Sequence, residues 1–227
     1  MVRPRVRIRF AKLAALRWVG HRDLMRCLER LFRRGGLPLA MSRGFHPKPR
    51  MMLPLALAVG IEGCEEVVEV ELTESPGAEA LLARLRPLAP PGLELLRAED
   101  LPPAAGKARA IAAEYRLAVG PPRPAALAEA VGRLWAAEAW PVHRRAAAGS
   151  GDPRRTGGDP RRAGARATID LRASLAALEL AGDVLVMRLR VAQAGSAGPR
   201  DVLAALGLAD VERQGARLVR TALELAP

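Results

Sequence analysis

The start of the chain alternates basic and apolar residues in the manner of a half-buried β-strand. From residue 5 to residue 10 every second side chain is an arginine, and the residues between them are apolar. A period of two places the two sets on opposite faces of a strand. We therefore predict a strand over 3–11 with one face in the core and three arginines on the other face, Arg5, Arg7 and Arg9.

A helical pattern follows this strand. Between Leu24 and Phe32 the apolar side chains recur at intervals of three and four residues, which is the spacing of one buried stripe. Asp23 suits the positive end of such a helix, and Gly35-Gly36 ends it. The pattern predicts an amphipathic helix whose other side carries five arginines, Arg22, Arg26, Arg30, Arg33 and Arg34.

Residues 37–50 (LPLAMSRGFHPKPR) predict a short strand followed by a loop. Gly44, Pro47 and Pro49 exclude regular structure from the second part of this segment. The loop presents Ser42 and four basic or titratable side chains, Arg43, His46, Lys48 and Arg50.

The remaining patterns complete an α+β fold. Residues 51–60 and 64–73 suggest a hairpin, 77–89 a helix and 92–98 a strand, which gives the order βαββαβ of a ferredoxin-like domain. The second half repeats this order without sequence identity between the halves: strand 110–119, helix 124–138, strand 140–145, strands 167–180 and 184–192, helix 199–208, strand 215–225. We expect two tandem ferredoxin-like domains, antiparallel sheets with helices on one face, over 1–100 and 110–227, joined by a linker at 101–109.

One segment of the second half departs from these patterns. The sequence GDPRR occurs at 151–155 and again at 158–162. A segment dominated by Gly, Pro and Arg cannot form a core, so we predict an Arg/Gly/Pro-rich mobile surface loop over 146–166. A duplication within a loop explains the repeat, and its arginines form a second basic cluster that could contact an anion.

Charge is distributed unevenly along the chain. Residues 1–50 hold fourteen lysines and arginines against two acids, an excess of twelve that equals the net charge of the whole chain, +12. Such an excess indicates a nucleic acid, an acidic partner or a membrane surface. A GC-rich genome could explain the use of arginine, but it does not explain why acids are missing from this part of the chain.

Several classes of function lack their signatures. No apolar run reaches the ~20 residues that span a bilayer, and no apolar segment follows the basic start as in a secretory signal. Cys27 and Cys64 lie far apart, so we expect a cytoplasmic protein without a disulfide and without an iron–sulfur cluster of its own. The three histidines, at 21, 46 and 143, lack metal-ligand spacing, and no phosphate-binding glycine loop or nucleophile elbow occurs. We expect no metal and no cofactor in this chain.

His21 and His46 are the only catalytic candidates. If the loop folded over the start of the helix, two imidazoles could act as general base and general acid in metal-free RNA cleavage. The structural alternative is that one histidine lies at a helix end and the other packs in a turn. We favour a non-catalytic module whose proline-braced basic loop holds a ligand.

The run from Trp18 to Gly63 resembles the opening of the radical SAM-linked protein family, a domain of unknown function encoded beside, or fused C-terminally to, B12-binding radical SAM proteins. The matching residues are His21, Asp23, Leu24, Met25, Arg26, Glu29-Arg30, Arg33-Arg34, Leu37-Pro38, Ser42, Gly44-Phe45, Pro47 and Leu53-Pro54-Leu55, with Ile169-Asp170-Leu171-Arg172 and Arg220-Thr221 further on. The resemblance implies an accessory protein of a radical SAM enzyme. The repeat at 151–162 lies outside the family pattern.

Three hypotheses follow. The leading one is a module that binds and presents RNA (tRNA or rRNA) for modification, with phosphate contacts from Arg5, Arg7, Arg9, Arg22, Arg26, Arg30, Arg33, Arg34, Arg43, His46, Lys48 and Arg50. The second is a protein that docks on an acidic face of the radical SAM enzyme without touching RNA. The third is an endoribonuclease that uses His21 and His46. For Asp170 and Arg172 we expect a buried pair that stabilises the second domain.

Overall fold

The computed structural model describes residues 3–120, 124–145, 166–192 and 195–226. Contacts group the chain into two compact units. The first unit combines residues 1–118 with 215–227, and the second unit comprises residues 119–214.

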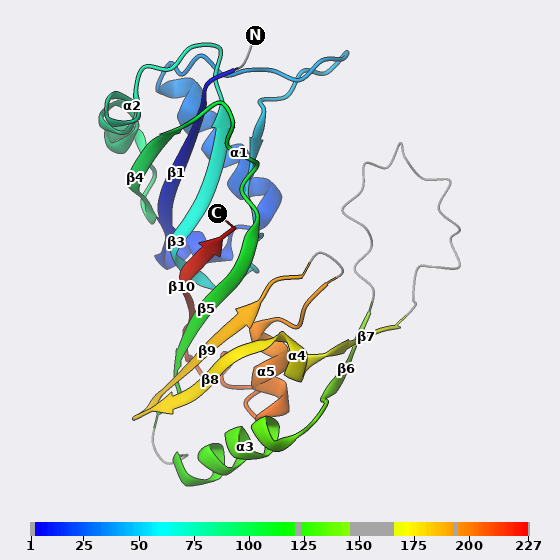
Figure 1. Cartoon of the computed structure of the whole chain (residues 1–227). Helices are drawn as coiled ribbons and strands as arrows, with labels where there is room; N and C mark the ends of the chain where they lie inside the picture. Colours follow the sequence, from blue (N-terminus) through cyan, green and yellow to red (C-terminus); the bar gives the residue numbers. More distant parts are fainter. Residues whose placement is uncertain (1–2, 121–123, 146–165, 193–194, 227) are drawn as a thin grey trace. The chain divides into compact units, whose positions relative to one another are not determined.

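The first unit is built on a mostly antiparallel sheet (Figure 1). Its strands are β1 (Arg5–Lys12), β2 (Met51–Met52), β3 (Glu62–Glu71), β4 (Leu93–Leu101), β5 (Ala110–Ala118) and β10 (Leu218–Leu225). They lie in the order β4-β1-β3-β10-β5, and β2 pairs with β3. The ladders are antiparallel except for the short β10–β3 ladder, which is parallel.

Two helices cover one face of this sheet: α1 (His21–Arg34) and α2 (Ala78–Leu85). The short 3-10 helices η1 (Ala14–Trp18) and η2 (Arg86–Leu88) connect them to the strands. The core contains the inward side of β1 and the apolar stripe of α1, as the two sequence patterns predict: Val6, Ile8 and Phe10 with Leu24, Leu28, Leu31 and Phe32. The strand predicted at 51–60 is reduced to β2. Pro54, which has no N–H for a ladder, follows closely.

The second unit has two separate antiparallel strand pairs. Its elements are α3 (Pro124–Ala136), β6 (Pro141–Arg145), β7 (Arg166–Asp170), α4 (Leu171–Ser174), β8 (Leu175–Ala181), β9 (Val184–Arg190) and α5 (Pro199–Ala205). Strand β6 pairs with β7, and β8 pairs with β9. The single strand predicted over 167–180 is interrupted by α4, because Asp170 caps that helical turn by accepting a hydrogen bond from the backbone N–H of Arg172.

The expected mixed α+β class is confirmed, with five α-helices and a large, mostly antiparallel sheet among the described residues. The boundaries of the two units differ from those of the predicted domains, 1–100 and 110–227. Strands β5 and β10 group with the first unit, because β10 forms backbone ladders with both β3 and β5. Of the loop predicted at 146–166, only Arg166 is described, so the GDPRR repeat lies outside the described residues. No helix in the described ranges is long and apolar enough to cross a membrane.

Candidate nucleic-acid interface

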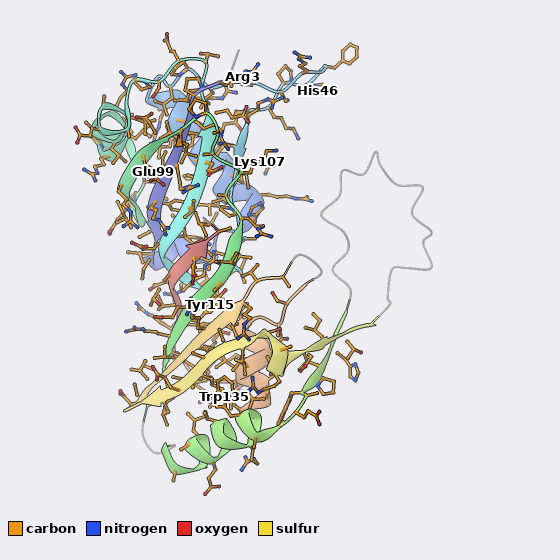
Figure 2. All side chains as sticks on the ribbon, viewed as in Figure 1. Arg3, His46, Glu99, Lys107, Tyr115 and Trp135 are labelled. Atoms are coloured by element: carbon orange, nitrogen blue, oxygen red, sulfur yellow. The ribbon has the colours of Figure 1, made fainter. Side chains whose placement is uncertain are left out.

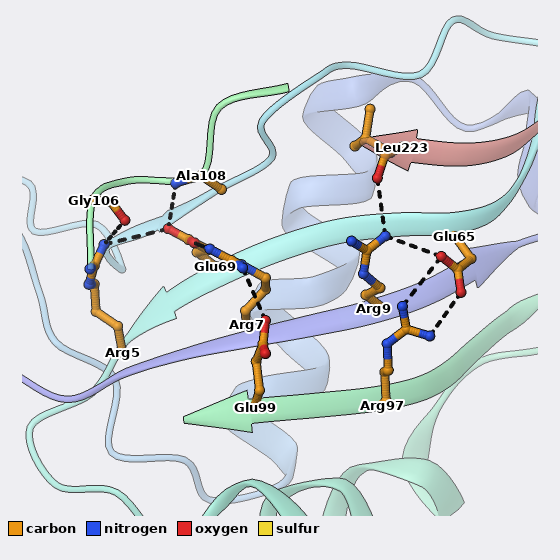
Figure 3. Close-up of polar contacts among 10 residues, drawn as sticks. All are labelled: Arg5, Arg7, Arg9, Glu65, Glu69, Arg97, Glu99, Gly106, Ala108 and Leu223. Atoms are coloured by element: carbon orange, nitrogen blue, oxygen red, sulfur yellow. Dashed lines mark hydrogen bonds and ion pairs between the residues drawn. The ribbon is translucent and has the colours of Figure 1, made fainter. Parts of the chain in front are cut away.

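The outer face of β1 carries the three predicted arginines, and the same sheet supplies their counter-ions (Figure 3). Arg7 lies between two carboxylates, 2.9 Å from Glu69 and 3.0 Å from Glu99. Arg5 lies 3.6 Å from the second oxygen of Glu69, which also accepts a hydrogen bond from the backbone N–H of Ala108 at 3.2 Å. Glu69 therefore neutralises two arginines while it is itself only 3% exposed.

Arg9 has the same kind of environment at the other end of the strand. It donates to Glu65 at 3.2 Å and to the backbone carbonyl of Leu223 at 3.2 Å. Arg97 of β4 binds Glu65 as well, at 2.9 Å. The anionic groups that neutralise the arginines of β1 are thus carboxylates of this chain.

Strand pairing brings these arginines close to glutamates. The antiparallel register sets Arg7 directly opposite Glu69 and Arg5 opposite Glu71, so opposite charges are cross-strand neighbours. Strand β3 carries five acids, Glu62, Glu65, Glu66, Glu69 and Glu71. The charge excess of residues 1–50 is therefore offset in part by a strand that follows it in the sequence.

Helix α1 retains a basic surface of its own. A groove of about 530 Å³ is lined by Arg26, Arg30, Arg33 and Arg34, together with Asp23, Cys27 and Pro90. Asp23 pairs with Arg26 at 3.0 Å, and Glu29 pairs with Arg33 at 3.0 Å. Arg22 and Arg30 are exposed and have no carboxylate partner among the described residues.

The arginines of α1 and of β1 do not form one surface. Helix α1 packs its apolar stripe on the inner face of the sheet, from which Val6, Ile8 and Phe10 point into the core. Arg5, Arg7 and Arg9 alternate with these residues and point to the other face. The two predicted sets of phosphate contacts lie on opposite sides of the first unit.

The predicted loop forms a protruding arm, residues 41–49, which we call the finger (Figure 2). An antiparallel bridge joins Met41 to Pro49 at its base. Above it the backbone N–H of Ser42 donates to the carbonyl of Lys48 at 2.8 Å, and the N–H of Lys48 donates to the Ser42 hydroxyl at 2.9 Å. Arg43, His46 and Lys48 are exposed on the finger, and their side chains have no carboxylate partner in the described part of the chain.

Basic side chains also gather at the base of the finger. Two hollows, of about 200 Å³ and 360 Å³, share Arg5, Arg50 and Glu71. Together they are lined by five cations and two carboxylates, Arg3, Arg5, Arg43, Arg50 and Lys107 with Glu69 and Glu71. Arg50 lies 3.4 Å from Glu71, whereas Lys107 has no ion pair within the described residues. We call this set the finger-base pocket.

The two candidate catalytic histidines lie at opposite ends of α1. His21 is the first residue of that helix, and His46 lies on the finger, which follows the other end of the helix (Figure 2). A helix of 14 residues is about 20 Å long. The finger does not fold over the start of the helix, so the geometry assembles no pair of imidazoles around one phosphate.

The residues of the resemblance that lie further along the chain have structural partners. Arg220 is 1% exposed and makes a two-pronged ion pair with Glu66, and it donates to the carbonyls of Leu55 and Ala56. Thr221 donates to Glu114 at 2.8 Å. These contacts join the C-terminal strand to β3, to β5 and to the segment that precedes β3.

Asp170 and Arg172 do not form the expected side-chain pair. Asp170 accepts hydrogen bonds from the backbone N–H groups of Trp140 and Arg172, both at 2.9 Å. The bond from Trp140 is the main cause that lowers the pKa of Asp170. The Arg172 guanidinium instead lies over the ring of Trp135, 4.1 Å from its centre. The motif is therefore a helix cap combined with a cation–π contact.

The cysteines are free thiols, and both are partly buried. Burial is the main cause that raises the pKa of both Cys27 and Cys64, which disfavours the reactive thiolate. Within the described ranges no group of three or more His, Cys, Asp or Glu residues is placed to hold a metal ion.

Three residues of this region were not singled out from the sequence. Arg3 and Lys107 line the finger-base pocket, although Lys107 is far from the finger in the chain and lies in the predicted linker. Phe45 is fully exposed on the finger. The signals for Phe45 in the sequence are its place in the matched pair Gly44-Phe45 and its position in a Gly/Pro turn before His46-Pro47.

Comparison with known proteins places the chain in a family. A family described as "uncharacterized protein conserved in bacteria" (DUF2344) matches residues 5–198. The chain belongs to this family. The match to DUF2344 spans the finger, α1 and most of the second unit.

The other comparisons add little. No curated protein matches the chain. Among solved structures, a crystal structure of an unknown protein from Galdieria sulphuraria is 15% identical over 99% of both chains, with a TM-score of 0.28. A likeness at that score carries no argument about fold or function.

Proposed function

We propose that this protein is an accessory protein of a radical SAM enzyme that binds RNA and presents it for modification. The RNA contact consists of the arginine groove of α1, the finger and the finger-base pocket. Arg22, Arg26, Arg30, Arg33, Arg34, Arg43, His46, Lys48 and Arg50 keep the phosphate-binding role expected from the sequence. Arg5 contributes at the edge of the pocket, and Arg7 and Arg9 stabilise the sheet.

One observation carries this proposal. In the first unit, the cations without a carboxylate partner are concentrated on α1 and around the finger. Arg22, Arg30, Arg43, Lys48 and Lys107 have no carboxylate partner within the described residues. The arginines of β1, in contrast, each face a glutamate. Unpaired exposed cations attract a polyanion, and phosphate contacts position it without reading its sequence.

The link to a B12-binding radical SAM enzyme rests on the resemblance of residues 18–63 to proteins encoded beside such enzymes. The cysteine content agrees with an accessory role, because two separate cysteines cannot hold the cluster that such an enzyme needs. The enzyme then carries the RNA-modifying chemistry, and this chain supplies the RNA binding.

We also propose the tandem ferredoxin-like arrangement for the fold. In the first unit the antiparallel ladders β4–β1, β1–β3 and β3–β2, with α1 and α2 between the strands, have the connectivity of a βαββαβ domain. Strand β5, helix α3, the β8–β9 hairpin, helix α5 and strand β10 follow in the same order along the chain.

The test is binding of the full chain to tRNA and rRNA fragments over a salt series. We expect the logarithm of the affinity to fall linearly with the logarithm of salt, by about 0.7–0.9 for each phosphate contacted. Arg22→Glu/Arg30→Glu should weaken binding strongly. Arg84→Glu/Arg133→Glu, which reverses the same number of exposed arginines elsewhere, should not.

Two results would overturn the RNA role. One is the absence of binding near physiological salt, which would leave docking on an acidic face of the enzyme as the better explanation. The other is equal weakening by both double variants, because binding would then follow net charge and not a surface.

A further inference from the structure

Phe45 lies at the tip of the finger and is 102% exposed, so its ring packs against nothing in the first unit. Single exposed apolar residues are common on proteins. This one differs because the segment that carries it protrudes from the body of the unit (Figure 2).

The finger is braced, which makes the position of the ring reproducible. The bridge between Met41 and Pro49 and the two hydrogen bonds between Ser42 and Lys48 close its base. His46 and Lys48 each precede a proline, and this restricts both residues to extended conformations. A braced loop loses little conformational entropy when it binds a ligand.

The charge around the ring indicates which ligand fits it. Arg43, His46 and Lys48 flank Phe45, and Arg50 lies at the base of the finger. The chain has no acidic residue between Glu29 and Glu62. An aromatic face among cations suits a nucleotide, whose base stacks on the ring while its phosphates meet the charges.

We propose that Phe45 stacks on an unpaired nucleobase of the bound RNA, while Arg43 and Lys48 hold the phosphates on either side. The inference rests on the proposed function and specifies its substrate class: RNA with an unpaired nucleotide in a loop, bulge or single strand. A continuous duplex offers no free base face to the ring.

The experiment compares two probes that differ in one base. The first is an RNA hairpin with a single unpaired adenine, and the second is the same hairpin with an abasic site at that position. Phe45→Ala and Phe45→Leu should weaken binding of the first probe by about 5- to 150-fold, the range measured when one stacking aromatic is removed. Phe45→Trp should retain binding, because it keeps an aromatic face.

The abasic probe supplies the control. Wild type and all three variants should bind it with equal affinity, since it has no base to stack. Phe45→Ala should also leave the salt slope unchanged, whereas Lys48→Gln should reduce the slope by about 0.7, the contribution of one phosphate of a single strand.

Several outcomes would overturn the inference while the proposed function survives. Wild-type affinity in Phe45→Ala, or an equal loss on the abasic probe, would exclude stacking. Retention of binding by Phe45→Leu would show that the ring acts only as an apolar contact. If Phe45→Ala lost association with the radical SAM enzyme but not with RNA, the finger would be a protein-docking element. If the wild type bound neither probe, the result would contradict the proposed RNA-binding function itself, and not only the stacking of Phe45.

Discussion

The buried pair of Arg220 and Glu66 gives the sharpest prediction about stability. Both side chains are almost fully buried, 1% and 2% exposed. Burial acts to lower the pKa of Arg220, but the Glu66 carboxylate outweighs it and holds that pKa above its ordinary value. The guanidinium is therefore charged in the folded protein at every pH of interest. It also donates to the carbonyls of Leu55 and Ala56, at 3.1 Å and 3.3 Å, and bonds to the side chain of Tyr115.

Glu66→Gln keeps the shape of the side chain and removes its charge. The variant leaves a buried guanidinium with only neutral acceptors, and breaking a buried ion pair in this way costs about 3–5 kcal/mol. That is a large part of the 5–15 kcal/mol by which a typical domain is stable. The melting temperature of the full chain should fall by roughly 6–20 °C relative to the wild type.

Two further variants separate the loss of this pair from a general loss of charge. Arg97→Gln breaks the exposed pair with Glu65 and should cost about 0–1 kcal/mol. Glu66→Met/Arg220→Met, which removes both charges, should recover most of the stability lost in the single variant. If Glu66→Gln cost no more than Arg97→Gln, the reasoning that this ion pair stabilises the contact of β10 with β3 would be refuted.

The other predictions concern the sheet face and the cap in the second unit. Glu69→Gln should lower the free energy of unfolding in urea by about 1.5–3 kcal/mol, because Arg5, Arg7 and the N–H of Ala108 share this carboxylate. Arg7→Gln should leave RNA affinity and its salt slope unchanged, and a reduced slope would show that the β1 face touches RNA. Asp170→Ala should lower the melting temperature above about pH 4, and the difference should shrink as the pH falls through the depressed pKa of Asp170, since the contribution of a carboxylate with a lowered pKa is lost only on protonation. A difference that persists in acid would contradict this origin.

The sequence predicted local elements well where a period was present. The alternation over 5–10 gives β1, and the three-four spacing over 24–32 gives α1 with the expected buried stripe. Both signals arise within a few residues, because they reflect which side of one element is buried.

The partners of the charges could not be predicted in this way. The arginines of β1 are neutralised by Glu65 and Glu69, some sixty residues later, and this match depends on strand register. The arrangement of β10 beside β3 depends equally on a contact across most of the chain. Local periodicity carries no information about which strands become neighbours.

The candidate site was predicted in part. The residues of α1 and the finger are exposed as expected, whereas the two histidines are separated by the length of α1. Phe45 was not predicted as a site residue, although it lies in the matched pair Gly44-Phe45, because a single aromatic in a Gly/Pro turn has no period. The role that we propose for it rests on its full exposure.

The most direct measurement is a protection map of the arginines in the presence of RNA. Full-length protein would be treated with an arginine-specific reagent, with and without a saturating folded RNA, and the modified residues identified by peptide mass spectrometry. RNA should protect Arg22, Arg30 and Arg43 and leave Arg84 and Arg97 as reactive as before. Equal reactivity of Arg22, Arg30 and Arg43 with and without RNA, under conditions where RNA is bound, would contradict an interface on α1 and the finger.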